Sequence, residues 1–237
     1  MIQLDNKKIL VVVAHPDDEL LGLGATIHKL VKYNHCVARA VILGEGITSR
    51  SDQRDRAVWK DELEIHRKNI YSAQQCIGYE SVGIYDFPDN RFDSVPLLDI
   101  VKIIEKENRE FIPDVIFTHH NGDLNIDHRI TSDAVVTATR PLQDESVKTI
   151  LSFETPSATE WQASNYPTLF NPNVYFTFEK DSLEAKIDGL NSYKMEVRDY
   201  PHPRSPEGLE ILAKYRGMIV GAMYAEAFYL LRTIVEK

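Results

Sequence analysis

A run of apolar residues at positions 9–13, Ile-Leu-Val-Val-Val, leads directly into Ala-His-Pro-Asp-Asp-Glu at positions 14–19. An uninterrupted, mostly β-branched run of this kind is typical of a strand that is buried on both faces of a parallel sheet. Open α/β sheets place their ligand crevices outside the carboxyl ends of their strands. The polar residues at 15–19 are therefore expected at the edge of the sheet where a ligand would bind.

The residue types at positions 15–18 suit a divalent metal. A neutral imidazole and a carboxylate both bind such ions, and a catalytic zinc typically takes three protein ligands and leaves one position for water. His15 and Asp18 can supply two ligands, while Asp17 can take a proton from that water as a general base. Pro16 fixes one backbone dihedral and stiffens the cluster. The simpler alternative is that Asp17, Asp18 and Glu19 cap the next helix, which leaves the preceding His-Pro unexplained.

The rest of the chain alternates strand-like apolar runs with helical spacing. This alternation predicts an α/β fold with a mostly parallel sheet flanked by helices, and the length suits one domain over residues 1–237. The expected strands are 9–13, 36–43, 81–85, 113–118, 149–153 and 174–178. The expected helices are 19–34, a long helix that follows a loop at 49–55 and ends near 76, then 95–109, 129–139, 183–193 and 207–220. Residues 225–234 fit either a helix or a strand.

Composition limits the partners and the compartment. The net charge of −9 and the pI near 5.4 disfavour non-specific binding to nucleic acid or to an anionic membrane. The apolar runs are too short to span a bilayer, and the first residues do not resemble a secretory signal. The two cysteines, Cys36 and Cys76, form no disulfide framework, which favours a reducing compartment. We expect a cytoplasmic protein with a small-molecule substrate, without nucleic acid or stable membrane insertion; a homo-oligomer remains open.

A second polar cluster, at positions 119–129, follows the predicted strand 113–118 and holds three histidines. His128 stands at the start of a predicted helix, at the same edge of the sheet as His15, and is our choice for the third metal ligand. Asp127 beside it can hold an imidazole tautomer through a hydrogen bond. His119 and His120 remain alternative ligands.

Several loops at strand ends carry candidates for substrate contact. Arg54, with Arg50 and Arg56, could meet an anionic substrate group, although a solvated helix face explains these arginines as well. Arg91 and Asp93 lie in a loop after strand 81–85, where function and turn chemistry compete as explanations.

Two segments of the second half of the chain add further candidates. His202 and Arg204 lie in a proline-bracketed, rigid loop, and we assign His202 a catalytic role and Arg204 a substrate contact. Trp161 could stack on the apolar face of a sugar ring, and a core or surface position is the alternative.

Two motifs together carry a resemblance to a known family. The first is AHPDDE at 14–19 with GLGAT at 22–26, and the second is GDLNIDHR at 122–129. In this order and separation they resemble the PIG-L/LmbE family of zinc-dependent N-acetylglucosaminide deacetylases. The resemblance implies a Rossmann-like α/β fold and a mononuclear zinc bound by His15, Asp18 and His128. It also implies that Asp17 is the general base and that the reaction removes an acetyl group from an amino sugar.

One position departs from the family pattern. Many members have a histidine three residues before the last ligand, where it is thought to help the oxyanion and the leaving amine; here the residue is Asn125. An amide can donate a hydrogen bond to an oxyanion but cannot deliver a proton to nitrogen. The proton for the amine would then come from Asp17, after it has accepted one from water, or from His202.

These observations leave three functional hypotheses. The first is a hydrolase that uses Zn²⁺, or Fe²⁺ or another divalent ion, to remove the N-acetyl group of an N-acetylglucosamine-type sugar or conjugate. The second is an amidase acting on a thiol conjugate or an antibiotic-type glycoside. The third is a non-catalytic Rossmann-like module for sugars or nucleotides, which the absence of a Gly-x-Gly-x-x-Gly turn and the acidic residues after the first strand disfavour.

Overall fold

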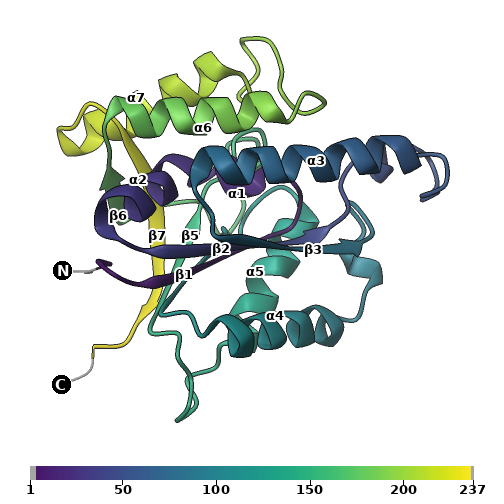
Figure 1. The fold of residues 1–237 in the computed structure, drawn as a ribbon, viewed down its shortest axis with the longest axis horizontal. Coiled ribbons are helices and arrows are strands. Elements are labelled where there is room, and N and C mark those ends of the chain that lie inside the picture. Colours follow the sequence, from purple (N-terminus) through teal and green to yellow (C-terminus); the bar gives the residue numbers. More distant parts are fainter. Residues whose placement is uncertain (1–3, 236–237) are drawn as a thin grey trace.

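The computed structural model describes residues 4–235 and shows a seven-stranded sheet covered by helices on both faces (Figure 1). The strand order is β3-β2-β1-β4-β5-β7-β6. Strands β1 to β5 are parallel to one another. Strand β7 is antiparallel to both of its neighbours, β5 and β6. The expected α/β fold with a mostly parallel sheet is confirmed. The strands are β1 (Lys8–Val13), β2 (Val37–Gly44), β3 (Ser81–Phe87), β4 (Val115–His119), β5 (Thr149–Phe153), β6 (Val174–Thr177) and β7 (Ala225–Thr233).

The helices form two layers on either side of the sheet. Figure 1 shows α2, α3, α6 and α7 on one side and α4 and α5 on the other. None of the helices within residues 4–235 is long and apolar enough to cross a membrane. The helices are α1 (Asp18–Leu21), α2 (Gly24–Asn34), α3 (Lys60–Ile77), α4 (Leu97–Phe111), α5 (Ile126–Ala138), α6 (Lys180–Ser192) and α7 (Pro206–Val220). Two 3₁₀ turns, η1 (Thr48–Arg50) and η2 (Phe92–Ser94), follow β2 and β3.

Strand β1 lies inside the sheet between β2 and β4 and packs into the two larger hydrophobic cores. Val11 and Val13 belong to the core that includes residues of α1, α2 and α3, while Leu10 and Val12 belong to the core that includes residues of α4 and α5. All four side chains are fully buried. Successive side chains of a strand point to opposite faces, so a strand that is covered on both sides is apolar at every position.

Several expected helix boundaries differ from the structure, and the structure settles one open assignment. The expected helix 19–34 is two helices, because the chain turns at residues 22–23, where a side chain on Gly22 would overlap Phe153. Helix α3 begins only at Lys60, and α5 begins at Ile126 rather than at 129. Residues 225–233 form strand β7, whose backbone pairs with both β5 and β6. Such long-range pairing outweighs local propensity.

The carboxyl ends of β1 and β4 are neighbours in the sheet. Going outward from this pair, the parallel strands follow one another in opposite directions, β1-β2-β3 on one side and β4-β5 on the other. The loops after β1 and β4 therefore lie on either side of a topological switch point, where open α/β sheets bind ligands. Both polar clusters singled out in the sequence follow these two strands.

Candidate active site

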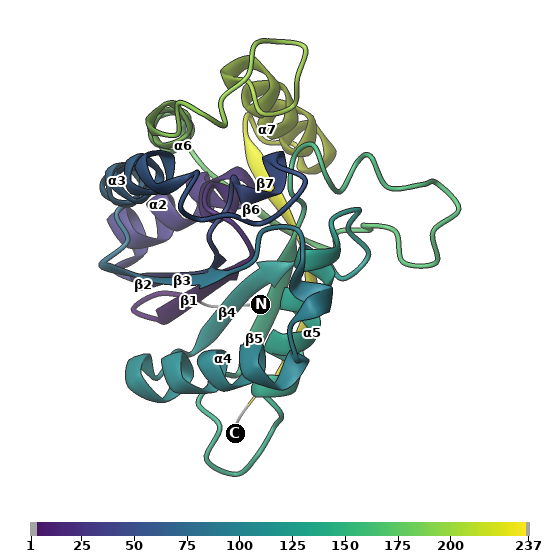
Figure 2. The same ribbon diagram turned by 90° about the vertical axis from the view of Figure 1, so that its right-hand side faces the viewer.

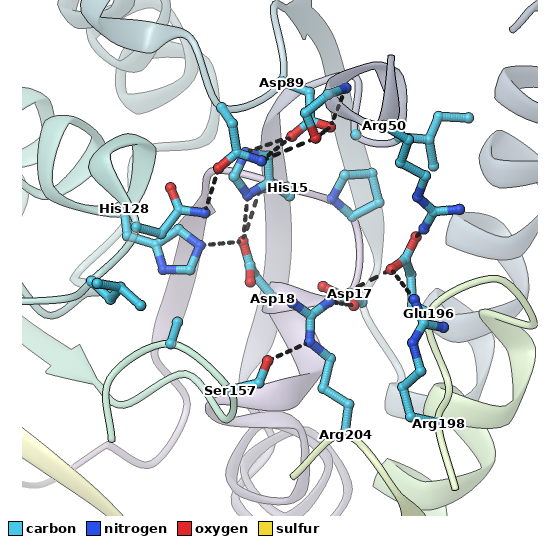
Figure 3. Close-up of a pocket in the computed structure, with 18 of the residues that line it drawn as sticks. His15, Asp17, Asp18, Arg50, Asp89, His128, Ser157, Glu196, Arg198 and Arg204 are labelled. Atoms are coloured by element: carbon cyan, nitrogen blue, oxygen red, sulfur yellow. Dashed lines mark hydrogen bonds and ion pairs between the residues drawn. The ribbon is translucent and has the colours of Figure 1, made fainter. Parts of the chain in front are cut away.

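A cavity of about 560 Å³ opens at this switch point. The loops after β1 and β4 form one wall, and residues from the loops after β2, β5 and α6 form the opposite wall (Figure 3). Its lining includes His15, Asp17, Asp18, Ser49, Arg50, His66, Asp89, Asn90, Asn125, His128, Ser157, Trp161, Glu196, Arg198, His202 and Arg204.

His15, Asp18 and His128 come together on the first wall, and Figure 3 shows the two rings on either side of the carboxylate. Asp18 Oδ2 lies 3.5 Å from His15 Nδ1 and 3.3 Å from His128 Nε2. Ligand atoms at about 2.1 Å from a tetrahedral zinc are about 3.4 Å apart, so these separations fit a shared ion. The two imidazoles and one carboxylate also fit in chemistry, because they are common ligands of catalytic zinc.

Carboxylates behind the two histidines hold their rings in place. Asp127 is fully buried, and its Oδ2 lies 2.9 Å from His15 Nε2 while Oδ1 accepts the backbone N–H of Phe92. This contact leaves the lone pair of His15 Nδ1 on the side of Asp18. His128 is held differently, because its Nδ1 lies 3.2 Å from Asp123 Oδ1. Asp127 thus contacts the imidazole of His15 and not that of its neighbour His128.

The site is a dense cluster of opposite charges. Burial tends to lower the pKa of both histidines, but the opposing effect of the surrounding carboxylates is larger. The pKa of His15 therefore lies well above its usual value, and that of His128 is raised to about 9. Burial tends to raise the pKa of Asp18, yet His128 and His119 hold it well below its usual range. The cluster therefore stabilises positive charge beside Asp18, which a bound cation can supply in place of the protons.

The alternative ligands His119 and His120 are used elsewhere. His119 Nε2 accepts the backbone N–H of Ala14 at 3.0 Å, and burial lowers the pKa of this histidine to about 4. Its neutral ring stacks on His128 with the ring centres 3.9 Å apart. His120 Nε2 lies 3.1 Å from the carbonyl oxygen of Thr168, away from the cavity lining. Within the described residues, the two groups able to hold an ion include neither histidine.

Asp17 lies beside the three donor atoms, and its backbone adopts an unusual conformation for a residue other than glycine. Its φ of 94° is in the left-handed region, and its N–H donates to Glu19 Oε2 at 2.9 Å. Tyr193 donates to the other oxygen of Glu19 at 2.5 Å. Asp17 makes no side-chain cap hydrogen bond to α1, so helix capping does not explain it.

The Asp17 carboxylate is paired with an arginine from the opposite wall. Arg204 Nη1 lies 3.0 Å from Asp17 Oδ2, and its Nε donates to Ser157 Oγ at 2.7 Å (Figure 3). Burial raises the pKa of Asp17 well above its usual value, although the Arg204 guanidinium opposes this shift. A carboxyl group in this environment can hold a proton nearer neutral pH than an exposed aspartate can.

His202 and Trp161 line the same side of the cavity. His202 Nδ1 accepts the backbone N–H of Arg204 at 3.1 Å, so the neutral ring carries its proton on Nε2. Trp161 is about half exposed, and its ring meets that of His202 edge-on with centres 5.6 Å apart. Trp161 belongs to the segment between β5 and β6, which projects from the body of the molecule in Figure 2.

Asn125 lines the cavity and also makes structural hydrogen bonds that its sequence motif did not indicate. Its Oδ1 accepts the N–H of Asp127 at 2.9 Å and thereby caps α5, while its Nδ2 donates to Asn90 Oδ1. The cap places His128 in the first turn of the helix. One amide N–H of Asn125 is left for another acceptor.

Arg54, Arg91 and Asp93 do not line the cavity, in contrast to the expected substrate contacts. Arg54 donates to both oxygens of Glu45 and to the carbonyl of Asp86. Arg91 donates to the carbonyl of Asp52, and Asp93 lies in turn η2. Polar contacts within the protein hold these loops in place. The sequence pattern alone does not distinguish residues that make such contacts from residues that contact a substrate.

Other residues of the cavity were not singled out from the sequence. Asp89 Oδ1 lies 3.3 Å from His15 Nε2, and its Oδ2 accepts a hydrogen bond from Ser49 Oγ. Glu196 comes from the segment after α6, where no motif marks it. Asp89 lies just after the end of a strand, and this position could have indicated that it belongs to the site. No feature of the sequence marks Glu196 as a site residue.

Comparisons with known proteins show which family the chain belongs to. The model of the family PIG-L, described as GlcNAc-PI de-N-acetylase, matches residues 10–139, more than half of the chain. The uncharacterized deacetylase YaiS of Escherichia coli is 28% identical over 79% of this chain and 91% of its own length. The diacetylchitobiose deacetylase of Thermococcus kodakarensis is 26% identical over 94% of this chain and 82% of its own length.

A solved structure shows the same fold. The N,N'-diacetylchitobiose deacetylase of Pyrococcus horikoshii, in complex with an inhibitor, superposes with a TM-score of 0.75 at 20% identity. The likeness covers 95% of this chain and 84% of the other. The matched residues 10–139 contain both sequence motifs and all three donor residues of the cluster. The chain therefore belongs to the PIG-L family.

Proposed function

We propose that the protein is a metal-dependent hydrolase that removes the N-acetyl group from an N-acetylglucosamine-type amino sugar or its conjugate. The observation that carries the proposal is the cluster of His15 Nδ1, Asp18 Oδ2 and His128 Nε2, with the Asp17 carboxylate beside it. Family membership supports the deacetylase activity, as do the two relatives that are named deacetylases. Zn²⁺ is the proposed ion, and Fe²⁺ fits the same ligands.

The three donors would hold the ion, and the neighbouring groups would handle protons and charge. When bound there, a divalent ion supplies a Lewis acid that polarises the acetyl carbonyl and makes a water more acidic. Asp17 accepts the proton of the attacking water. Because burial raises the pKa of Asp17, the carboxyl can then return this proton to the leaving amine.

Two further side chains can stabilise the oxyanion that develops on the acetyl group. His202 Nε2 carries a proton that its partner at Nδ1 fixes in place, and Asn125 retains one free amide N–H. Both line the cavity. A hydrogen bond to a developing oxyanion lowers the barrier more than one to the neutral carbonyl does. Arg204 pairs with Asp17, so its proposed role is to orient the base.

The shape of the cavity supports a sugar substrate. Its volume of about 560 Å³ lies within the usual range for small-molecule sites. The lining is rich in carboxylate, amide and hydroxyl groups, which bind sugar hydroxyls, and the exposed Trp161 offers a flat surface for a ring. An amidase for a thiol or antibiotic-type conjugate would use the same chemistry. The extent of the catalytic domain, residues 1–237, and the cytoplasmic location remain predictions.

The test is release of free amine and acetate from a panel of N-acetylglucosamine derivatives: free sugar, glycoside, nucleotide-linked and lipid-linked forms. We expect turnover of at least one of them by metal-loaded protein, loss of turnover after chelation, and recovery on adding Zn²⁺ or Fe²⁺. Absence of amine release from the whole panel by protein with a full equivalent of metal would refute the proposed reaction.

A further inference from the structure

A group of basic side chains around one glutamate lies in the cavity beyond Asp17, on the side away from the proposed metal ligands (Figure 3). It consists of Arg50 from η1, His66 from α3, and Glu196, Arg198 and Arg204 from the segment between α6 and α7. We call these five residues the arginine lobe. The proposed reaction needs only Arg204 among them.

Glu196 is the centre of the lobe. It is 8% exposed, and Arg50 Nη2 lies 2.5 Å from its Oε1. Arg204 Nη1 and Arg198 Nη2 lie 3.6 Å and 3.9 Å from Oε2. Only the Arg50 contact is a short ion pair, so one carboxylate attracts three guanidinium groups but closely pairs with one.

The charges of the lobe do not balance. Its three arginines face two carboxylates, Glu196 and Asp17, and Arg204 contacts both of them. Arg198 is the least paired, because its Nη1 donates to the backbone carbonyls of Met195 and Val197 and its Nη2 only approaches Glu196. The excess is positive in a chain whose net charge is −9. An arginine fork with free donors is suited to carboxylate or phosphate.

His66 gives a second, independent indication of a ligand. It is 2% exposed and lines the cavity, yet neither ring nitrogen has a hydrogen-bond partner among the described residues. The nearest charged oxygen, Glu196 Oε1, lies 3.5 Å from Nε2. Buried polar atoms are rarely left without a partner unless a ligand or water satisfies them.

We propose that the arginine lobe binds an anionic group, a carboxylate or a phosphate, on the part of the substrate that is attached to the acetylated sugar. This proposal rests on the proposed function, because it places the acetamide at the metal ligands and the anion at the far end of the same cavity. Arg50 and Arg198 are the specificity-determining residues. A neutral aglycone would leave the excess charge of the lobe facing only water.

The kinetic test compares substrates that differ only in charge. One pair is the carboxymethyl glycoside of N-acetylglucosamine and its carboxamidomethyl analogue; a second pair is the 2-phosphoethyl glycoside and its 2-hydroxyethyl analogue. We expect kcat/KM to be at least about tenfold higher for the charged member of one pair, with the difference shrinking as salt rises. Whichever pair shows the larger ratio tells carboxylate from phosphate.

Variants locate the preference in the lobe. Arg50→Gln and Arg198→Gln should each reduce the ratio to about threefold or less, mainly through KM of the charged substrate. His66→Phe, which keeps a ring against Tyr193 but removes both nitrogens, should also lower the ratio. The matched control is Arg109→Gln, which removes the same charge from an exposed position on α4 and should leave the ratio unchanged.

Binding without turnover separates this proposal from the proposed reaction. Glucosides in which a hydroxyl replaces the acetamido group cannot react, and calorimetry on the wild-type protein can compare the charged and neutral members of each pair. Tighter binding of a charged member that Arg198→Gln abolishes supports the lobe even if no deacetylation occurs. Equal affinity for charged and neutral members, or a preference that survives both arginine substitutions, overturns the proposal.

Discussion

The two walls of the cavity are built in different ways. One wall, which we call the metal wall because it holds the proposed metal ligands, takes His15 and Asp17 from the loop after β1, Asp18 from the start of α1 and His128 from the first turn of α5. Strand ends that are neighbours in the sheet therefore position this wall. The opposite wall is assembled from loops after β2, β5 and α6, far apart in the sequence. The family match ends at residue 139 and leaves out most of that wall. We infer that the first wall sets the reaction and the second sets the substrate.

The strongest test of this division is the loss of a metal ligand. His128→Ala removes one of three donors, and we expect bound metal to fall below a tenth of an equivalent and kcat/KM to fall by about a thousandfold or more. Metal analysis of the purified variant and an amine-release assay measure the two effects.

His120→Ala is the matched control, because it deletes a buried histidine of the same β4–α5 segment whose Nε2 contacts the backbone of Thr168. Its metal content should stay at the wild-type level. Loss of metal in His120→Ala but not in His128→Ala would exchange the roles of the two residues and break the account of the metal wall.

The metal wall could be predicted from the sequence because its parts are local. The uninterrupted apolar run at 9–13 predicts the strand. His15 and Asp18 follow the carboxyl end of this run directly in the sequence. The second motif gives His128 by the same logic. Distances between the loops need no separate prediction, since β1 and β4 lie side by side once the sheet forms. The residue types suggested the division of roles between Asp17 and Asp18, and the family resemblance implies the same division.

The opposite wall could not be predicted in the same way. Glu196 lies after a helix whose position depends on packing against α2 and α3, and no local pattern reports that packing. Arg54 and Arg50 look alike in sequence, yet Arg54 pairs with Glu45 outside the cavity while Arg50 reaches Glu196. Arg204, for which we predict a substrate contact, lines the cavity and also pairs with Asp17, a partner that the sequence does not reveal. Which partner a long side chain finds is a tertiary property.

Replacing the proposed base is expected to have the next largest effect. Asp17→Asn keeps the shape of the side chain but cannot accept a proton, so kcat should fall by about a hundredfold to a thousandfold. Metal content should stay near one equivalent, because Asp18 rather than Asp17 belongs to the donor cluster. Loss of both metal and turnover would show that the two aspartates have exchanged roles.

The Arg204–Asp17 pair links the two walls and predicts a pH effect. Asp17 must be deprotonated to accept a proton, so the rate should rise with pH through the pKa of Asp17. Burial raises this pKa and the Arg204 charge lowers it. Arg204→Gln removes the lowering contribution, so the acidic limb of the kcat/KM profile should move to higher pH by about one unit, a tenfold loss on that limb.

Arg204→Lys distinguishes the charge from the hydrogen-bond geometry. Lysine keeps a positive charge near Asp17 but cannot at the same time reproduce the guanidinium contact to Ser157 Oγ. The acidic limb should return most of the way to the wild-type position while the rate at its plateau stays reduced. An acidic limb that does not move in Arg204→Gln would mean that Asp17 is not the titrating base.

The smallest expected effect concerns the sugar surface on the second wall. Trp161 is half exposed, and its one ring contact among residues 4–235 is edge-on with His202, so Trp161→Ala should cost the fold little. Loss of a stacking surface worth about 1 kcal/mol should raise KM about fivefold and leave kcat within twofold, since the contact is the same before and during reaction. Trp161→Phe should recover most of the affinity. A fall in kcat with unchanged KM would instead place Trp161 beside the reacting atoms and weaken the distinction between the two walls.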